Sequence, residues 1–535
     1  MKKLKPINRW DLASVIFFLT LLGILILIPN LTTTYYDDIS YHLMAAQNFE
    51  RSGGIVAWDL GESLPTGRAH NYPPLLHILL IPLLKLHLDG FLLIRLIASL
   101  AVLISLLLGW AGLRHLFGQR PAFFFLAVTG FSGAYLPFLA VLIPASIVFA
   151  LTPWLIYLLK NGKTAAAAVL LAVMLYTHMF IPGLIIVTLI FWSLIQRQQF
   201  KTTLIAIGAA LLLYSPLALY VVLNWDFIKY FNVSYLAIDK PVWIGIDVSI
   251  SLLFILAVWY LWPRVKEDRK SYWQFFFLLT LVQTPLFFTN YPGRFFISGG
   301  FFAIAITIAI LLDQLASQSR RRLLTGLIVG ILVAGNIINI QIWFNQADFS
   351  SARLEVNRAF FSQAAAIWLK GSAAWPKLKD YPYTDANRRL AKSISQSSQE
   401  NEVIYTLAKR FNGQKIPWYR PFAVGQFFAA LSNRPMANPR MPEYFWHQPP
   451  PLEQIRILII NQDDPIINRT DFQIVAQNDE LVVLQNKRPG TLKIDPPKPV
   501  LNQYLAWLII LLAALFIGRE IKNLTQKKYA IDKKG

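Results

Sequence analysis

The sequence contains no cysteine in its 535 residues. Disulfide bonds, thiolate metal sites and thiol nucleophiles are therefore excluded. This absence says little about the compartment in which the protein works.

Charged residues are also scarce, at 15% of the chain, whereas hydrophobic residues make up 55%. The mean hydropathy is +0.46. A water-soluble protein of this length needs a far more polar surface. Apolar runs of about 20 residues recur, and each is long enough to cross a hydrocarbon core of about 30 Å as a helix. The sequence therefore predicts an α-helical integral membrane protein.

Acidic residues are few, with 29 Asp and Glu against 50 Lys and Arg, and the formal net charge is +21. In a soluble protein this excess would suggest nucleic-acid binding. In a membrane protein it marks the cytoplasmic loops. With the N-terminus inside, the basic cytoplasmic segments are 1–9, 114–120, 161–163, 196–201, 263–270, 313–322 and 519–535. We therefore expect no nucleic-acid partner, and a multi-pass protein of the inner (plasma) membrane with both termini cytoplasmic.

About twelve membrane-spanning helices fit the apolar pattern. They are expected at 10–29, 90–112, 121–137, 145–159, 164–179, 183–196, 202–222, 246–262, 272–289, 295–312, 323–344 and 501–518. The first lacks the small-residue cleavage pattern of a signal peptide, so we expect it to be retained. This topology leaves 30–89, 223–245 and 345–500 on the outer side.

Three parts follow from this topology. Residues 1–344 form a transmembrane module, and its outer loop 30–89 holds an acidic pair. Residues 345–500 are polar enough to fold in water as a small extracytoplasmic α/β domain. Residues 501–535 supply a last transmembrane helix and a basic cytoplasmic tail.

Local patterns predict the elements of the first outer loop. Ile39–Arg51 has the spacing of an amphipathic helix, which Gly53-Gly54 stops. Pro73-Pro74 then opens an apolar helix over Leu75–Leu88.

The polar segment before the last span has its own pattern. Helices are expected over Ala352–Lys370 and Asp385–Ser395. Strands are expected over Val403–Leu407, Ile455–Ile460, Phe472–Ala476 and Leu481–Gln485. A hairpin turn at 477–480 joins the last two strands.

Asp37 and Asp38 stand where the chain has just left the membrane. Adjacent acids at a helix start can simply cap amide groups. Here Tyr41 and His42 follow within about one turn, so groups that can bind an acceptor gather at one membrane-facing place. A general base there would take a proton from an acceptor hydroxyl or amine that attacks a sugar carbon. Two carboxylates can also bind a divalent cation such as Mg²⁺ or Mn²⁺, which leaves a metal requirement open.

Other polar residues on the outer side have two interpretations each. His70 and His178 could bind the substrate, although a satisfied packing role is favoured for His178. Asp59 and Glu62 could bind an acceptor, but solvated loop acids are favoured. His70 and His77 are seven residues apart, which gives little support for a metal site.

The order of these features resembles the GT-C glycosyltransferases, polytopic membrane enzymes that take sugars from polyprenyl-phosphate carriers. Asp37-Asp38 after the first span, then Tyr41 and a helix that ends at Gly53-Gly54, is similar to the first outer loop of that family. Its members include protein O-mannosyltransferases, aminoarabinose transferases and oligosaccharyltransferase catalytic subunits. The resemblance implies that Asp37 is the catalytic base or positions the acceptor, that Asp38 is its partner, and that transfer is inverting.

A second segment is similar to a Lys-Pro-Pro-Leu motif that opens the next helix in the family. It is Asn71-Tyr72-Pro73-Pro74-Leu75-Leu76, with Tyr72 where the family has a lysine that faces the lipid phosphate. Arg68, His70 or Arg95 could supply the missing charge. We expect Tyr72 to contact the substrate.

A third segment, Tyr291-Pro292-Gly293-Arg294-Phe295-Phe296, is similar to an Arg-Tyr segment on an outer loop of many members. This similarity implies that Arg294 binds the phosphate of the donor. An arginine at a helix end can also snorkel to the membrane interface without any substrate.

The sequence therefore predicts a GT-C membrane glycosyltransferase of cell-envelope glycan biosynthesis. It would move a sugar from a polyprenyl-phosphate donor to a glycan, lipid or protein acceptor outside the cytoplasm. A transporter or flippase of lipid-linked glycans is one alternative, although no repeat symmetry or broken helix is evident. A non-catalytic scaffold of the same fold is another, because the family lysine is missing.

Overall fold

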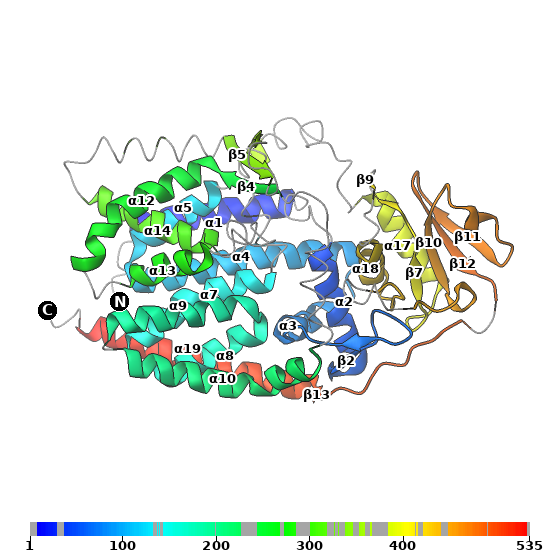
Figure 1. Cartoon of the computed structure of the whole chain (residues 1–535), viewed down its shortest axis with the longest axis horizontal. Coiled ribbons are helices and arrows are strands. Elements are labelled where there is room, and N and C mark those ends of the chain that lie inside the picture. Colours follow the sequence, from blue (N-terminus) through cyan, green and yellow to red (C-terminus); the bar gives the residue numbers. More distant parts are fainter. Residues whose placement is uncertain are drawn as a thin grey trace, which may run out of the picture.

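The computed structural model describes most of the chain. The described residues are 8–28, 37–131, 136, 139, 143–197, 199–225, 243–267, 272–284, 300–317, 326, 330, 338–345, 352–358, 364–365, 384–411, 414–415, 421–439, 448–488 and 491–531. Long helices run side by side along the longest axis, and a smaller unit with a β-sheet lies at one end (Figure 1). The two chain termini lie at the opposite end (Figure 1).

Apolar helices form the larger part. They are α1 (Arg9–Leu27), α4 (Gly90–Phe117), α5 (Gln119–Phe131), α7 (Ile143–Lys160), α8 (Thr164–Thr177), α9 (Phe180–Gln196), α10 (Phe200–Leu223), α12 (Val248–Glu267), α13 (Trp273–Gln283), α14 (Gly300–Ala316) and α19 (Gln503–Ile531). Each overlaps a span that the sequence predicts. Among the described helices, α1, α4, α7, α10 and α19 are long and apolar enough to cross a bilayer.

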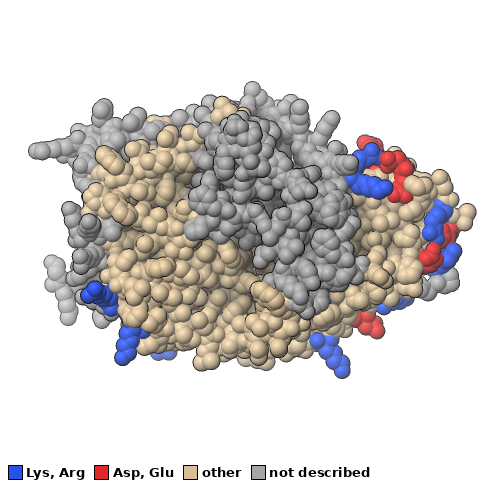
Figure 2. Space-filling model, viewed as in Figure 1, with Lys and Arg blue, Asp and Glu red and all other residues tan. Residues whose placement is uncertain are grey.

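The outer surface of these helices is apolar. Leu19 and Ile26 of α1 are 63% and 68% exposed, and Leu515 of α19 is 60% exposed. Such surfaces are stable against lipid and unfavourable in water. On the face drawn in Figure 2, the visible charged side chains lie toward the two ends of the molecule. The chain is a helical membrane protein.

A three-stranded antiparallel sheet corrects two predictions. Strand β5 (Ile338–Asn345) pairs with β4 (Trp243–Asp247) and β6 (Ala352–Arg358). The span expected at 323–344 is therefore wrong from Ile338 onward, and the helix expected at 352–370 is wrong over β6. The sequence of β5 alternates apolar and polar residues at its start, as does that of β6, and a period of two favours a strand over a helix.

The loop of residues 37–89 begins with α2 (Asp37–Ser52), which extends one or two residues beyond each end of the helix predicted over Ile39–Arg51. The helix ends at Gly53, whose φ of +72° suits a residue without a side chain. Strand β1 (Gly54–Ile55) then pairs with β13 (Leu501–Asn502). A Cβ on Gly54 would lie 2.1 Å from the Leu501 carbonyl oxygen, so only glycine allows this approach. The pairing ties the end of α2 to the start of α19.

The rest of this loop is a hairpin and a short helix. The hairpin joins β2 (Trp58–Asp59) to β3 (Arg68–Ala69), and α3 (Leu75–Leu84) follows the two prolines. The prediction that this helix reaches Leu88 is wrong. The chain turns at His87, with φ +50°, and the Asp89 carboxylate accepts from the Phe91 amide at 3.1 Å to begin α4.

The unit at the far end is an α/β structure. Its four-stranded sheet has the order β11-β12-β10-β7, with β7 parallel to β10 and the other pairs antiparallel. Its elements are α17 (Asp385–Ser397), β7 (Ile404–Thr406), β8 (Arg410–Phe411), β9 (Gln414–Lys415), α18 (Pro421–Ser432), the 3₁₀ helices Leu452–Gln454 and Pro465–Asn468, β10 (Ile457–Asn461), β11 (Phe472–Gln477) and β12 (Leu481–Asn486).

The predicted helix at Asp385 and the four predicted strands are confirmed within one or two residues at each end. The hairpin turn is also confirmed: the Asn478 side chain accepts from the Glu480 and Leu481 amides at 3.0 and 2.7 Å. Helix α18 was not predicted. It packs against α2, where the Gln47 side-chain amide donates to the Ala430 carbonyl at 2.8 Å. The α/β unit is therefore anchored on α2.

Candidate active site

The acidic pair opens α2. Asp37 is the first residue of that helix, and its side chain lies outside the described part of the structure. Asp38 is exposed. A carboxylate at this position is favoured by the positive end of the helix dipole, whether or not it also takes part in chemistry.

One turn further along α2, Tyr41 and His42 are buried. Two elements meet here, because His42 Nδ1 lies 3.0 Å from Nε2 of His77, which is 35 residues further along the chain on α3. The Tyr72 ring packs on the rings of His42 and Tyr41. Its centroid lies 5.2 Å from that of His42 and 5.7 Å from that of Tyr41. Pro73 and Pro74 start α3 directly after Tyr72, so the proline motif sets this arrangement.

A second buried group lies beside the first. Asp59 accepts from the Asn48 side chain and from the Gly61 amide, both at 2.7 Å, and its other oxygen lies 3.4 Å from His70 Nδ1. The rings of His70 and His77 are 5.4 Å apart, so the two groups are in contact. Burial alone raises the pKa of the Asp59 carboxyl. The hydrogen bond and charge of His70, with the Gly61 amide, outweigh burial and hold that pKa below its ordinary value.

The prediction that Asp59 and Glu62 are solvated loop acids is wrong, since each is 1% exposed. Glu62 lies 3.6 Å from Arg68 Nη1 and accepts from the Gln426 side chain of α18 at 3.3 Å. The acids are buried because the α/β unit covers the hairpin, a contact between segments more than 350 residues apart. Arg68 is therefore already paired with a carboxylate.

His178 lies between α8 and α9. Its Nδ1 accepts from the Phe180 and Ile181 amides, each at 3.2 Å, so it caps the start of α9. Its ring centroid is 6.2 Å from that of Tyr72. The packing role is present, and the residue also borders the buried cluster.

Of the predicted phosphate-binding arginines, Arg294 lies outside the described residues. Arg95 is half-buried on α4, and its Nε has no hydrogen-bond partner in the described structure. A metal ion at the acidic pair stays a prediction, and within the described residues no group of three or more His, Asp or Glu is placed to hold one.

Sequence reasoning missed three contributors: Asn48, His77 as the partner of His42, and Gln426. The first two had a usable signal. Asn48 follows Met44 and Tyr41 on one face of α2, and His77 lies one turn into a helix whose start the prolines mark. Gln426 had no such signal in the sequence, because only tertiary packing brings α18 to this loop.

No family model matches the chain, and no curated protein sequence does. Solved structures do match. ArnT from Cupriavidus metallidurans bound to undecaprenyl phosphate is similar over 90% of this chain and 99% of ArnT, with 13% identity and a TM-score of 0.55. The chain has the GT-C fold.

Two further solved structures are similar to this chain. The apo form of the same ArnT has 14% identity and a TM-score of 0.50 over the same shares. The archaeal oligosaccharyltransferase AglB from Archaeoglobus fulgidus, in complex with an inhibitory peptide and a dolichol-phosphate, covers 84% of this chain and 69% of AglB. Its identity is 11% and its TM-score 0.48, a likeness too weak to support further conclusions. The resemblance seen in the sequence is confirmed at the level of the fold.

Proposed function

We propose that this GT-C protein is a membrane glycosyltransferase that uses a polyprenyl-phosphate-linked sugar as donor. The observation that supports this most is the shared fold with ArnT bound to undecaprenyl phosphate, along nearly the whole chain. The acidic pair at the start of α2, next to a buried cluster of histidine and tyrosine rings, supports a reaction centre there. The active site would face the extracytoplasmic side of the inner membrane.

In the reaction that we propose, Asp37 accepts the proton of an acceptor hydroxyl or amine. The freed electron pair forms a bond to the anomeric carbon of the sugar, and the bond from that carbon to the phosphate oxygen breaks. Polyprenyl phosphate leaves with the negative charge, which Arg294 and Arg95 would stabilise. The product has the inverted anomeric configuration, because one displacement occurs without a covalent sugar intermediate.

The other predicted residues have separate proposed roles. Tyr72 and His178 are half-buried, so they can contact the substrate directly. Tyr41, His42 and His70 are buried and would position Tyr72 and the start of α2. Asp38 would hold the acceptor beside Asp37 or bind a divalent cation with it. Arg68 is the weakest candidate for phosphate binding, since Glu62 already neutralises part of its charge.

The α/β unit, whose elements run from Asp385 to Asn486, would shape access for the acceptor. The basic segments at the end of the molecule that holds both termini would then be cytoplasmic.

The test is mass spectrometry of envelope glycolipids, glycans and glycoproteins from cells with the wild type, a deletion, Asp37→Asn or Asp479→Asn. Loss of a general base typically costs 10²- to 10⁴-fold, so about a hundredfold drop in one modification is expected in Asp37→Asn. The matched control removes an exposed carboxylate in a turn of the α/β unit and should behave as the wild type.

A lost modification together with accumulation of its polyprenyl-phosphate donor supports the proposal. A deletion phenotype that Asp37→Asn does not share, at equal expression, would instead support a flippase or a scaffold.

A further inference from the structure

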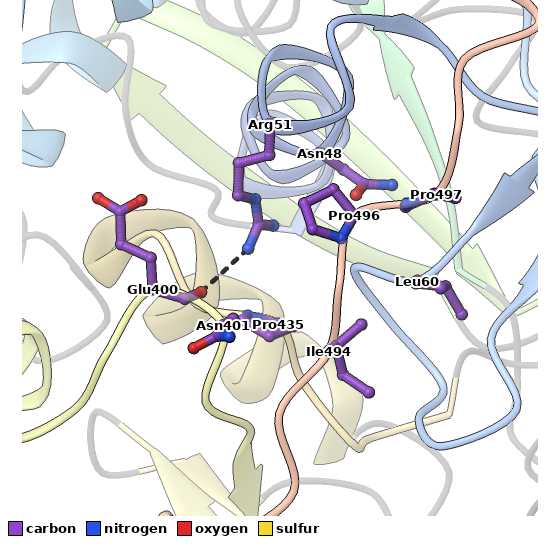
Figure 3. Close-up of a pocket in the computed structure, with 9 residues that line it drawn as sticks. All are labelled: Asn48, Arg51, Leu60, Glu400, Asn401, Pro435, Ile494, Pro496 and Pro497. Atoms are coloured by element: carbon purple, nitrogen blue, oxygen red, sulfur yellow. Dashed lines mark hydrogen bonds between the residues drawn. The ribbon is translucent and has the colours of Figure 1, made fainter.

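A pocket lies at the end of α2 opposite the acidic pair. Its volume is about 370 Å³. Three parts of the chain form it: the end of α2 with the adjoining loop, the α/β unit, and the proline-rich segment that leads to α19. The lining residues are Asn48, Arg51, Leu60, Glu400, Asn401, Pro435, Ile494, Pro496 and Pro497 (Figure 3).

Arg51 is the only cationic side chain among the residues that line this pocket. Its Nη1 donates to the Glu400 backbone carbonyl at 3.2 Å. Its Nε is buried and has no hydrogen-bond partner, and no carboxylate of the described residues forms an ion pair with Arg51. Burial lowers the pKa of the guanidinium, which nevertheless stays charged at neutral pH. The Arg51 side chain is half-buried and its Nε is fully buried without a partner, so a directly bonded anion would stabilise it, and this arrangement favours an anionic ligand.

Asp59, Glu400 and Glu50 each favour the charged form of Arg51 through space, but none of the three forms an ion pair with it. Asp59 is held by Asn48, Gly61 and His70 and does not line the pocket. The Glu400 side chain is exposed, and Figure 3 shows its carboxylate pointing away from the other labelled residues. Glu400 contacts Arg51 through its backbone carbonyl instead.

The distance along α2 restricts what the ligand can be. Arg51 follows Asp37 by 14 residues on one helix, which is about 21 Å at 1.5 Å per residue. The donor phosphate is bonded to the carbon that the acceptor attacks, so it must lie within a few ångströms of the reacting group near Asp37. It cannot reach this pocket at the same time.

We propose that the pocket binds an oxyanion group of the acceptor, a phosphate or a carboxylate, while the attacking group of the acceptor lies at Asp37. This inference rests on the proposed function and narrows it, because it makes the acceptor an extended anionic glycan or glycolipid. Asn48 and Asn401 add amide groups beside the guanidinium, and Leu60, Ile494 and the prolines form apolar walls against which sugar rings can pack. The α/β unit contributes to acceptor recognition through Glu400, Asn401 and Pro435.

The first experiment measures binding on the purified full chain in lipid nanodiscs. Thermal unfolding is followed against inorganic phosphate and, separately, D-glucuronate, with chloride at equal ionic strength as the blank. A ligand that binds only the folded state raises the melting temperature. The variants are Arg51→Gln, Arg51→Lys, Asp37→Asn and Arg410→Gln, a matched control on an exposed arginine of the α/β unit.

The wild type, Asp37→Asn and Arg410→Gln should be stabilised by at least one of the two anions. Arg51→Gln should bind it about 10- to 100-fold more weakly, as expected when a charge-assisted hydrogen bond is lost. Arg51→Lys should be intermediate, because it keeps the charge and loses the planar fork. A response to phosphate alone identifies a phosphate-bearing acceptor, and a response to glucuronate alone identifies an acidic sugar.

Equal stabilisation of the wild type and Arg51→Gln would overturn the proposal, as would no stabilisation of any variant. If Arg51→Gln does not fold, the anion stabilisation of Arg51→Lys is compared with that of the wild type instead. Equal stabilisation of these two proteins would then overturn the proposal.

A kinetic experiment separates this proposal from the proposed function. With the acceptor that mass spectrometry identifies, Arg51→Gln should raise the acceptor KM about tenfold and leave kcat unchanged, whereas Asp37→Asn should lower kcat. An unchanged KM in Arg51→Gln overturns the acceptor site while the glycosyltransferase proposal stands. Full transfer by Asp37→Asn contradicts our catalytic assignment even if anion binding at Arg51 is intact.

Discussion

Buried polar side chains are satisfied in two different ways in the two regions of this molecule. In the long helices several buried hydroxyls bond to their own helix: the Thr152, Thr188 and Thr307 hydroxyls each donate to the carbonyl four residues earlier, at 2.7 to 2.9 Å. In the loop of residues 37–89, buried side chains bond across the chain, as His42 does to His77 and Glu62 does to Gln426.

The difference follows from the backbone. A membrane helix satisfies its own amides and carbonyls, so the preceding turn is the nearest partner for an isolated hydroxyl. The hairpin and short helices of residues 37–84 offer few such partners, and their buried polar groups depend on one another. Removing one of these groups leaves another unsatisfied, which ties the local structure to the candidate site. Three substitutions test this contrast.

The largest effect on stability is expected at Glu62. Glu62→Gln removes the carboxylate that pairs with buried Arg68, and the loss of one partner of a buried ion pair typically costs about 3–5 kcal/mol. The melting temperature of the purified chain measures it. Asp463→Asn is the matched control, because its pair with Arg410 is more than half exposed and should contribute little. Similar shifts in the two variants would show that the hairpin is not buried as described.

A smaller effect is expected at His77. His77→Phe keeps a ring of similar size but removes the nitrogen that lies 3.0 Å from His42, so we expect a loss of about 1–3 kcal/mol. Thr307→Val in α14 removes a buried hydroxyl whose acceptor carbonyl keeps its helical bond, and it should change the melting temperature little. Equal losses in both variants would remove the contrast between the two regions.

The smallest effect is a dependence on pH at Asp59. Its pKa in the folded protein is below its ordinary value of 3.8, which the unfolded chain approaches. The folded state therefore binds fewer protons, so the stabilisation is present above pH 3.8 and is lost as the pH falls through the folded pKa. Between pH 5 and pH 3 the melting temperature of the wild type should fall more than that of Asp59→Asn. Parallel curves of melting temperature against pH would show that Asp59 is not held as a carboxylate.

Much of the fold could be predicted because period and hydropathy act locally. The long apolar runs specified helices such as α1, α4 and α19, and Gly53 and the two prolines specified the ends of α2 and the start of α3. The same reasoning failed at β5 and β6, where alternation competes with high hydropathy, and at α18, which packs against α2, α17 and β7.

For the candidate site, too, some features could be predicted from the sequence and others depended on tertiary packing. The sequence by itself determined the membrane class, the position of Asp37 and Asp38 at the start of a helix that follows the first apolar segment, and the proline motif that begins α3 directly after Tyr72, because these depend on neighbours in the chain. Only the tertiary structure decided that Asp59 and Glu62 are buried, that His42 meets His77, and that Arg51 lines a pocket beneath the α/β unit. Burial and pairing between segments up to hundreds of residues apart depend on packing, which no local pattern encodes.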